Sequence, residues 1–142
     1  MAVTIYLRGL PEIQEKIQLL MGSVRNMEPH LAWAVPQFEG AIKRNFAAGG
    51  RPTGWVAKAD GSPARLVKSN RLRGGIKGEA SGDEIRIGTS GIPYAAIHHF
   101  GGMTGRKHAA RMPARPYMVI IPEEKERGMK KILESMRREL KI

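Results

Sequence analysis

The chain has 142 residues, of which 42% are apolar and 26% are charged, with a formal net charge of +11. This composition is typical of a single globular domain spanning residues 1–142 and excludes a disordered chain. The absence of cysteine excludes disulfides, thiolate catalysis and cysteine-ligated zinc. We expect an intracellular protein without membrane contact, because no signal peptide is visible and the apolar run at 118–121 is too short to span a bilayer.

The positive charge is concentrated in one part of the chain. Between residues 43 and 77 the sequence has nine lysines and arginines against one acid, Asp60. Such a stretch attracts phosphate groups or acidic protein surfaces. A glycine- and proline-rich loop that is merely solvated by its charge explains the pattern equally well, so both interpretations stay open.

The N-terminal region predicts a strand and then a helix. Val3, Ile5 and Leu7 alternate with Thr4 and Tyr6, as in a strand with one buried face. A helix should begin at Pro11, because proline suits the first helical turn. Its apolar residues recur every three or four positions and should form a buried stripe: Ile13, Ile17, Leu20, Val24 and Met27.

A second amphipathic helix should follow, with its junction to the first near Pro29. Its apolar stripe is Leu31, Val35, Phe38, Ile42 and Phe46. Pro36 lies inside this pattern and should kink or split the helix, and the glycines at 49–50 should end it.

Residues 49–69 form a long connection rich in glycine, proline and positive charge. Loops of this length are usually functional or disordered, so we expect mobility in the free subunit. Trp55 is the large apolar anchor of this connection. The more frequent role for such a tryptophan is to pin a loop onto the body, and an exposed partner contact is the alternative.

The middle of the chain predicts a capped turn and a hairpin. Ser69 or Asn70 should cap a single helical turn that stops at glycine. Residues 76–80 and 84–88 should pair as a hairpin through a turn at 81–83. Ile85 and Ile87 then share one face of the second strand.

A short helix over 93–100 should open at Pro93 and end at Gly101 and Gly102, before a flexible basic loop at about 101–112. Pro113 and Pro116 favour extended backbone around Arg115. The Arg115 guanidinium is suited to hold backbone carbonyls or a carboxylate. A strand should follow at 117–121.

The last helix should begin at Pro122, with the acids Glu123 and Glu124 at its positive end. Its expected buried stripe is Met129, Ile132, Leu133, Met136 and Leu140, with the basic residues facing out: Lys130, Lys131, Arg137 and Arg138. The predicted class is α+β. A small antiparallel sheet is flanked by the N-terminal helix pair and the C-terminal helix, with long basic loops.

The sequence does not support an enzyme or a metal site, and we expect no cofactor. His98 and His99 are adjacent, so in a helix they point about 100° apart and cannot easily share a metal. His98 should instead bond a backbone group of the following loop. His30 and His108 have no carboxylate at ligand spacing. The serines lie in turns or caps, and the glycine pairs follow helices, which is the wrong end for holding phosphate.

Two stretches together resemble the tailed-bacteriophage virion morphogenesis family, the tail-completion proteins of Mu-like phages. They are IPYAAIHHFGG at 92–102 and PARPY at 113–117, which contain Tyr94, His98, Phe100, Gly101, Gly102, Pro113, Arg115 and Pro116. Phe46, Trp55 and the segments 65–73 and 85–89 are also similar to the family pattern. Asn70 stands where several relatives have glycine, and asparagine also tolerates left-handed backbone.

The resemblance implies a structural protein of a phage or prophage, made in the bacterial host cytoplasm and acting at the head–tail junction of the virion. It implies a homo-oligomeric ring, with a hexamer as one candidate, and portal, connector or tail proteins as partners. No catalytic residue carries over. The expected interaction loops carry Arg51, Trp55, Lys58, Arg65, Arg106 and Lys107. The alternative is a small basic module that contacts DNA non-specifically, although no zinc-finger, helix-turn-helix or aromatic binding-sheet signature is present.

Overall fold

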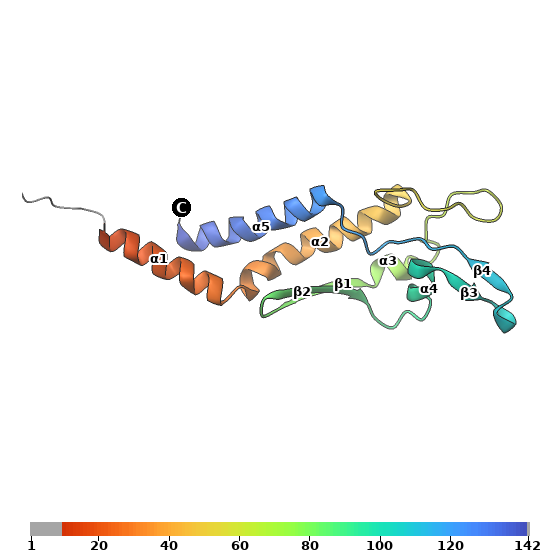
Figure 1. Ribbon diagram of the computed structural model, residues 1–142, viewed down its shortest axis with the longest axis horizontal. Helices are drawn as coiled ribbons and strands as arrows, with labels where there is room; N and C mark the ends of the chain where they lie inside the picture. The colour runs from red at the N-terminus through yellow and green to blue at the C-terminus, as the bar shows by residue number, and fades with distance from the viewer. Residues whose placement is uncertain (1–9, 142) are drawn as a thin grey trace, which may run out of the picture.

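The computed structural model describes residues 10–141, with side chains from residue 14 onward, and combines helices with two small antiparallel sheets (Figure 1). The elements in order are α1 Leu10–Arg25, α2 Glu28–Ala48, α3 Arg71–Gly74, β1 Ile76–Ser81, β2 Glu84–Thr89, α4 Ala95–Phe100, β3 Gly102–Thr104, the 3-10 turn η1 Arg106–His108, β4 Ala110–Met112 and α5 Pro122–Leu140. The α+β class is confirmed, with its N-terminal helix pair and C-terminal helix. The strand expected at 3–7 lies outside the described residues.

The long helix α2 lies at the centre of the molecule. α5 runs antiparallel along one side of it, and the β1–β2 hairpin lies along the other (Figure 1). α2 does not split at Pro36. Pro36 has no backbone N–H, so the Ala32 carbonyl loses its helical hydrogen bond. Both residues are exposed, so water can bond this carbonyl instead. α2 ends at Gly49, which adopts left-handed backbone with φ 68°.

The core collects around the C-terminal half of α2. Its buried apolar residues come from α2, α3, β1, α4 and the segment before α5: Ile42, Phe46, Leu72, Ile76, Ala95 and Tyr117. The Phe46 ring lies 5.6 Å from the Trp55 ring, nearly perpendicular to it, and 5.4 Å from the Tyr117 ring. Trp55 also donates its indole N–H to the Pro116 carbonyl over 2.8 Å. Trp55 thus pins the 49–69 connection to the body, as the more frequent role predicts.

The predicted hairpin forms with Ile76 opposite Thr89 and Ser81 opposite Glu84. Its isoleucines on β2 are half-buried on one face, as expected. A second hairpin, β3 with β4, occupies part of the segment 101–112 that we expected to be an irregular loop. These strands have three residues each, which is too short for an alternating pattern to show in the sequence.

The strand expected at 117–121 does not form. Side chains provide the hydrogen bonds that a neighbouring strand would give. Asn45 of α2 donates its two amide protons to the Tyr117 and Val119 carbonyls, each over 2.7 Å. The Nδ1 atom of His99 accepts from the backbone N–H groups of Tyr117 and Met118, at 3.3 and 3.4 Å.

The helix α1 forms as predicted, but three residues of its predicted apolar stripe are exposed. Of the other two, Ile13 lies outside the described side chains and Met27 is half-buried just beyond the helix. Ile17 is 51% exposed, Leu20 43% and Val24 57%, whereas Ser23 is buried and donates to Glu139 of α5 over 2.6 Å. The α5 stripe is only partly covered, with Met129 and Leu133 exposed. The helical period therefore identifies the apolar face of each helix but not what covers it. None of the described helices is long and apolar enough to cross a membrane.

Candidate partner-binding site

Arg115 joins three segments of the chain at the end of the molecule that carries α4. It is 7% exposed, and its Nε and Nη2 atoms donate to the carbonyls of Val56 and Ala57 over 3.0 and 3.2 Å. Its backbone N–H donates to the His98 carbonyl over 2.9 Å. We expected Arg115 to hold either backbone carbonyls or a carboxylate, and backbone carbonyls are its partners in the structure.

Gly101 lets the chain leave α4 at this point. Its backbone has φ 70° and ψ −173°, a combination that suits only glycine. A Cβ here would lie 2.6 Å from the Ala114 nitrogen and 2.8 Å from the Met112 carbonyl oxygen. Glycine therefore allows the 112–114 backbone to pass against the end of α4, which places Arg115 where it can reach the connection.

The adjacent histidines have different roles. The predicted bond from His98 to the backbone of the following loop is wrong: the neighbouring His99 bonds the backbone, and it does so beyond that loop, at residues 117 and 118. The Nδ1 atom of His98 is buried without a hydrogen-bond partner among the described residues. Burial lowers the pKa of both imidazoles, and the positive charge of Arg115 lowers the pKa of His98 further. Tyr94 packs edge-on against the His98 ring, and Phe100 is exposed.

Arg51, one of the expected interaction residues, is only partly exposed and is bound by residues of α2 and α5. Its Nη1 atom lies 3.1 Å from Oε1 of Glu124, and its Nε atom donates to Oδ1 of Asn45 over 2.9 Å. Its Nη2 atom donates to the Ala41 carbonyl over 2.8 Å. Arg51 therefore takes part in the hydrogen bonds that join α2 to α5. Its buried counterion is Glu124, which the sequence identified only as a favourable charge at the start of a helix.

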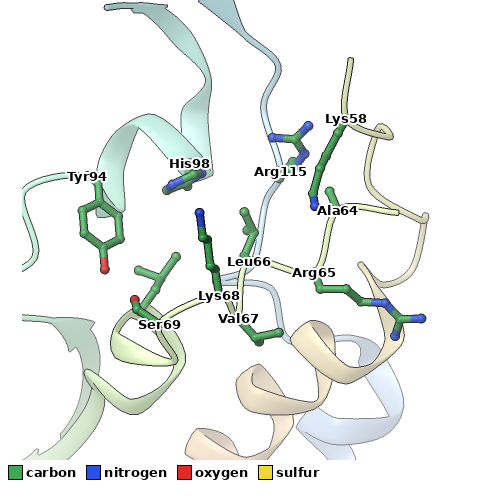
Figure 2. Close-up of a pocket in the computed structure, with 11 residues that line it drawn as sticks. Lys58, Ala64, Arg65, Leu66, Val67, Lys68, Ser69, Tyr94, His98 and Arg115 are labelled. Atoms are coloured by element: carbon green, nitrogen blue, oxygen red, sulfur yellow. The ribbon is translucent and has the colours of Figure 1, made fainter. Parts of the chain in front are cut away.

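A pocket of about 730 Å³ opens between α4, the 49–69 connection and the segment leading into α3 (Figure 2). Its basic lining is Lys58, Arg65, Lys68, His98 and Arg115. Figure 2 shows the Lys68 side chain pointing toward His98, with Arg115 beyond. The structure thus brings Lys58 to the same pocket as Tyr94, His98 and Arg115 of the 92–117 motif. Arg65 also borders the pocket, but Figure 2 shows its guanidinium turned away, and its Nη1 atom donates to the Ala47 carbonyl over 3.1 Å.

The remaining expected interaction residues lie elsewhere. Arg106 and Lys107 are exposed in η1, between the strands of the second hairpin, and neither lines this pocket. The sequence did not single out Lys68 as an interaction residue, although Lys68 lies in the basic stretch. No local pattern indicates which cations of that stretch turn toward α4. Within residues 10–141, no group of three or more histidines, aspartates and glutamates could hold a metal ion.

Comparison with known proteins defines the class. Residues 11–141 match the phage virion morphogenesis family, and the chain belongs to this family, the Mu-like group of virion proteins that the motif resembles. It is similar to Mu-like prophage FluMu G protein 2 of Haemophilus influenzae, with 32% identity over 123 residues that cover 86% of this chain and 87% of that protein. No solved structure matches it. The chain is a phage virion morphogenesis protein.

Proposed function

We propose that this protein completes the tail at the head–tail junction of a Mu-like phage or prophage, as a subunit of a homo-oligomeric ring. It would be made in the host cytoplasm and incorporated into the virion, with portal, connector or tail proteins as neighbours. Membership of the phage virion morphogenesis family supports an assembly role rather than an enzymatic one. The single observation that supports self-association is the exposed apolar stripe of α1.

The exposed surface consists of Ile17, Leu20 and Val24 of the predicted stripe together with the adjacent Met21, each more than 40% exposed. Their spacing of three, one and three places them on one face of α1. A face of this kind normally packs against another surface, because leaving it in water forfeits roughly 1.5–3 kcal/mol for each large side chain. The α1 stripe is therefore suited to a neighbouring copy.

The size of this surface favours a ring over an isolated dimer. Four side chains bury much less than the ~800 Å² per partner of a standard stable interface. A weak contact gains strength when each subunit makes it on two sides of a closed ring, because the last contacts form within one assembly. This is the arrangement expected of a subunit at a symmetrical junction.

The experiment compares oligomeric states by light scattering coupled to size exclusion. Ile17→Glu places a charge on the stripe, and Gln18→Glu adds the same charge at the next, exposed position outside it. We expect the wild type and Gln18→Glu to form the same oligomer and Ile17→Glu to be a folded monomer, with a melting temperature lowered only by the lost stabilisation from self-association. A monomeric wild type at all concentrations, or an unchanged oligomer in Ile17→Glu, would overturn the ring proposal.

The junction role is tested in particles. A prophage that lacks this gene should accumulate heads and tails that do not join, and the wild-type gene should restore joined particles that contain the protein. Complete, infectious particles without the protein would contradict the proposal. Tight binding of duplex DNA by a stable monomer would favour the alternative of a basic nucleic-acid-binding module.

A further inference from the structure

We propose that the pocket between α4 and the 49–69 connection binds an acidic segment of a partner protein, with a carboxylate held among Lys68, His98 and Arg115. The identity of that partner as a virion protein rests on the proposed function. The pocket itself is argued from its charge, its unused polar atoms and its shape.

The pocket collects positive charge that nothing in the described part of the chain neutralises. Lys58, Arg65, Lys68 and Arg115 are in no ion pair within residues 10–141, and no carboxylate of this range lines the pocket. Some cations outside the pocket have a counterion, as where Lys130 and Lys131 pair with glutamates of their own helix. The charge of the pocket is thus left for a ligand.

The acid closest in sequence to these cations does not fill this role. Asp60 is exposed and accepts from both the hydroxyl and the backbone N–H of Ser62, at 2.5 and 2.9 Å. Those bonds lower the pKa of Asp60, with a further contribution from the charge of Lys58. Asp60 therefore belongs to a local turn of the connection and does not line the pocket.

Two polar groups in the pocket have hydrogen-bonding atoms that no described residue uses. Arg115 is buried and has only neutral carbonyls as its side-chain partners, through Nε and Nη2, which leaves Nη1 for an anion. The Nδ1 atom of His98 is buried without a partner among the described residues. A buried charge and a buried polar atom are both costly without a partner. A ligand carboxylate would accept from Nη1 of Arg115 and from the Lys68 ammonium, which Figure 2 shows beside the His98 ring.

The shape favours a protein segment over a DNA duplex. The pocket is concave, its volume of about 730 Å³ suits a few side chains, and apolar groups of Leu66, Leu72 and Tyr94 form part of its lining. The phosphates of a duplex lie on a convex surface, so a duplex would contact the rim and leave the apolar groups uncovered. An acidic side chain flanked by apolar ones satisfies both parts of the lining.

The test uses the full chain with labelled histidines and follows the His98 ring by NMR. The probes are a blocked peptide of alternating glutamate and leucine, its glutamine counterpart, and a short DNA duplex. The pocket variant is Lys58→Gln with Lys68→Gln. The matched control is Lys130→Gln with Lys131→Gln, which removes the same charge from the exposed face of α5.

We expect the glutamate peptide to shift the His98 resonances and the glutamine peptide to leave them unchanged. The pocket variant should weaken binding by about tenfold or more, whereas the control variant should bind within about twofold of wild type. Equal weakening in both variants would mean diffuse attraction and would overturn the proposal. Equal binding of the glutamine peptide, no shift of His98, or displacement of the peptide by a lower concentration of duplex would also overturn it.

The pocket and the junction role fail separately. If the peptide test fails while the gene is still needed for joined particles, the pocket proposal alone is wrong. If the peptide binds as expected while particles join without the protein, the junction proposal is wrong and the pocket stands.

Discussion

Glu124, in the first turn of α5, is clasped by the guanidinium of Arg44 near the end of α2. The Nε atom of Arg44 lies 2.8 Å from Oε1, and its Nη2 atom lies 2.6 Å from Oε2. Arg51 adds a contact of 3.1 Å to Oε1, and Gln37 donates to Oε2 over 3.2 Å. With 1% of Glu124 exposed, this buried carboxylate fixes the start of α5 against the end of α2.

Glu124→Gln should lower the free energy of unfolding by roughly 2–4 kcal/mol, because both arginines lose their counterion while the site stays buried. Urea denaturation of the purified chain measures this. Glu123→Gln is the control, because its exposed side chain occupies the same helical turn, and it should change stability by less than about 0.5 kcal/mol. Equal effects of the two substitutions would show that only the charge at the helix start matters.

The free energy of unfolding should also depend on pH through Glu124. Hydrogen bonding to Arg44, with a smaller contribution from Arg51, lowers the pKa of Glu124 from 4.5 to about 2. The folded state therefore keeps the carboxylate ionised where the unfolded chain takes up a proton. The contribution is complete above about pH 4.5 and is lost as the pH falls toward 2.

Because Arg44 is partly exposed and screened by solvent, we expect this contribution to be on the order of 1–3 kcal/mol. Urea midpoints of the wild type and of Glu124→Gln, measured from about pH 6 down to about pH 2.5, should converge as the pH falls. A constant difference across this range would show that ionisation of Glu124 makes no contribution.

Asn45→Ala should be among the most destabilising polar substitutions in the chain. It removes both donors from the Tyr117 and Val119 carbonyls and the acceptor of Arg51 from a fully buried position. We expect a loss of about 2–4 kcal/mol, measured by thermal unfolding. Asn26→Ala, at the exposed junction of α1 and α2, is the control and should have little effect. A comparable loss at both positions would contradict the proposed role of Asn45.

Arg115→Lys should lower stability by about 1–3 kcal/mol, because an ammonium group cannot reproduce the two planar bonds to Val56 and Ala57. Arg106→Lys, in the exposed η1 turn, keeps the charge in the same way and should melt like the wild type. Limited proteolysis of the 49–69 connection provides a second readout and should be faster in Arg115→Lys. Unchanged melting and unchanged proteolysis would show that Arg115 does not hold the connection.

Gly128→Ala should destabilise the α2–α5 contact by at least about 1–3 kcal/mol, because a Cβ at this position of α5 would overlap the Phe38 ring. Gly22→Ala offers the opposite case within α1, where a Cβ meets nothing within 4 Å. There the gain in helix propensity should stabilise the chain by about 0.5–1 kcal/mol. Denaturant midpoints of the two variants should therefore move in opposite directions. A shift in the same direction would contradict the close approach of the two helices.

The sequence predicted best those features of the fold that depend on residues close to each other in the chain. Pro122 marked the first turn of α5, Gly49 the end of α2, and the alternation around Ile85 and Ile87 the second strand of the hairpin. Asn70 adopts left-handed backbone with φ 57°, as its substitution for glycine implied. Each of these features rests on backbone geometry within a few residues.

Features that depend on distant partners could not be read in this way. Arg51 and Arg115 each directly precede a proline, yet Arg51 is bound by Glu124, 73 positions later. The 117–121 segment has the composition of a strand, but Asn45 takes the place of the neighbouring strand. The apolar period of α1 is real, and only the tertiary structure shows that its stripe stays exposed within one chain.

The pairing of α2 with α5 constrains how the chain folds during synthesis. Arg44 finds Glu124 80 positions later, and His30 contacts Ser135 105 positions later. α2 therefore leaves the ribosome long before α5, and the side of α2 that packs against α5 stays uncovered until that helix has been made, even after the β1–β2 hairpin covers the other side. Such non-local closure folds slowly compared with local helical pairing. A nascent chain that stalls before residue 122 presents this uncovered face to host chaperones and proteases.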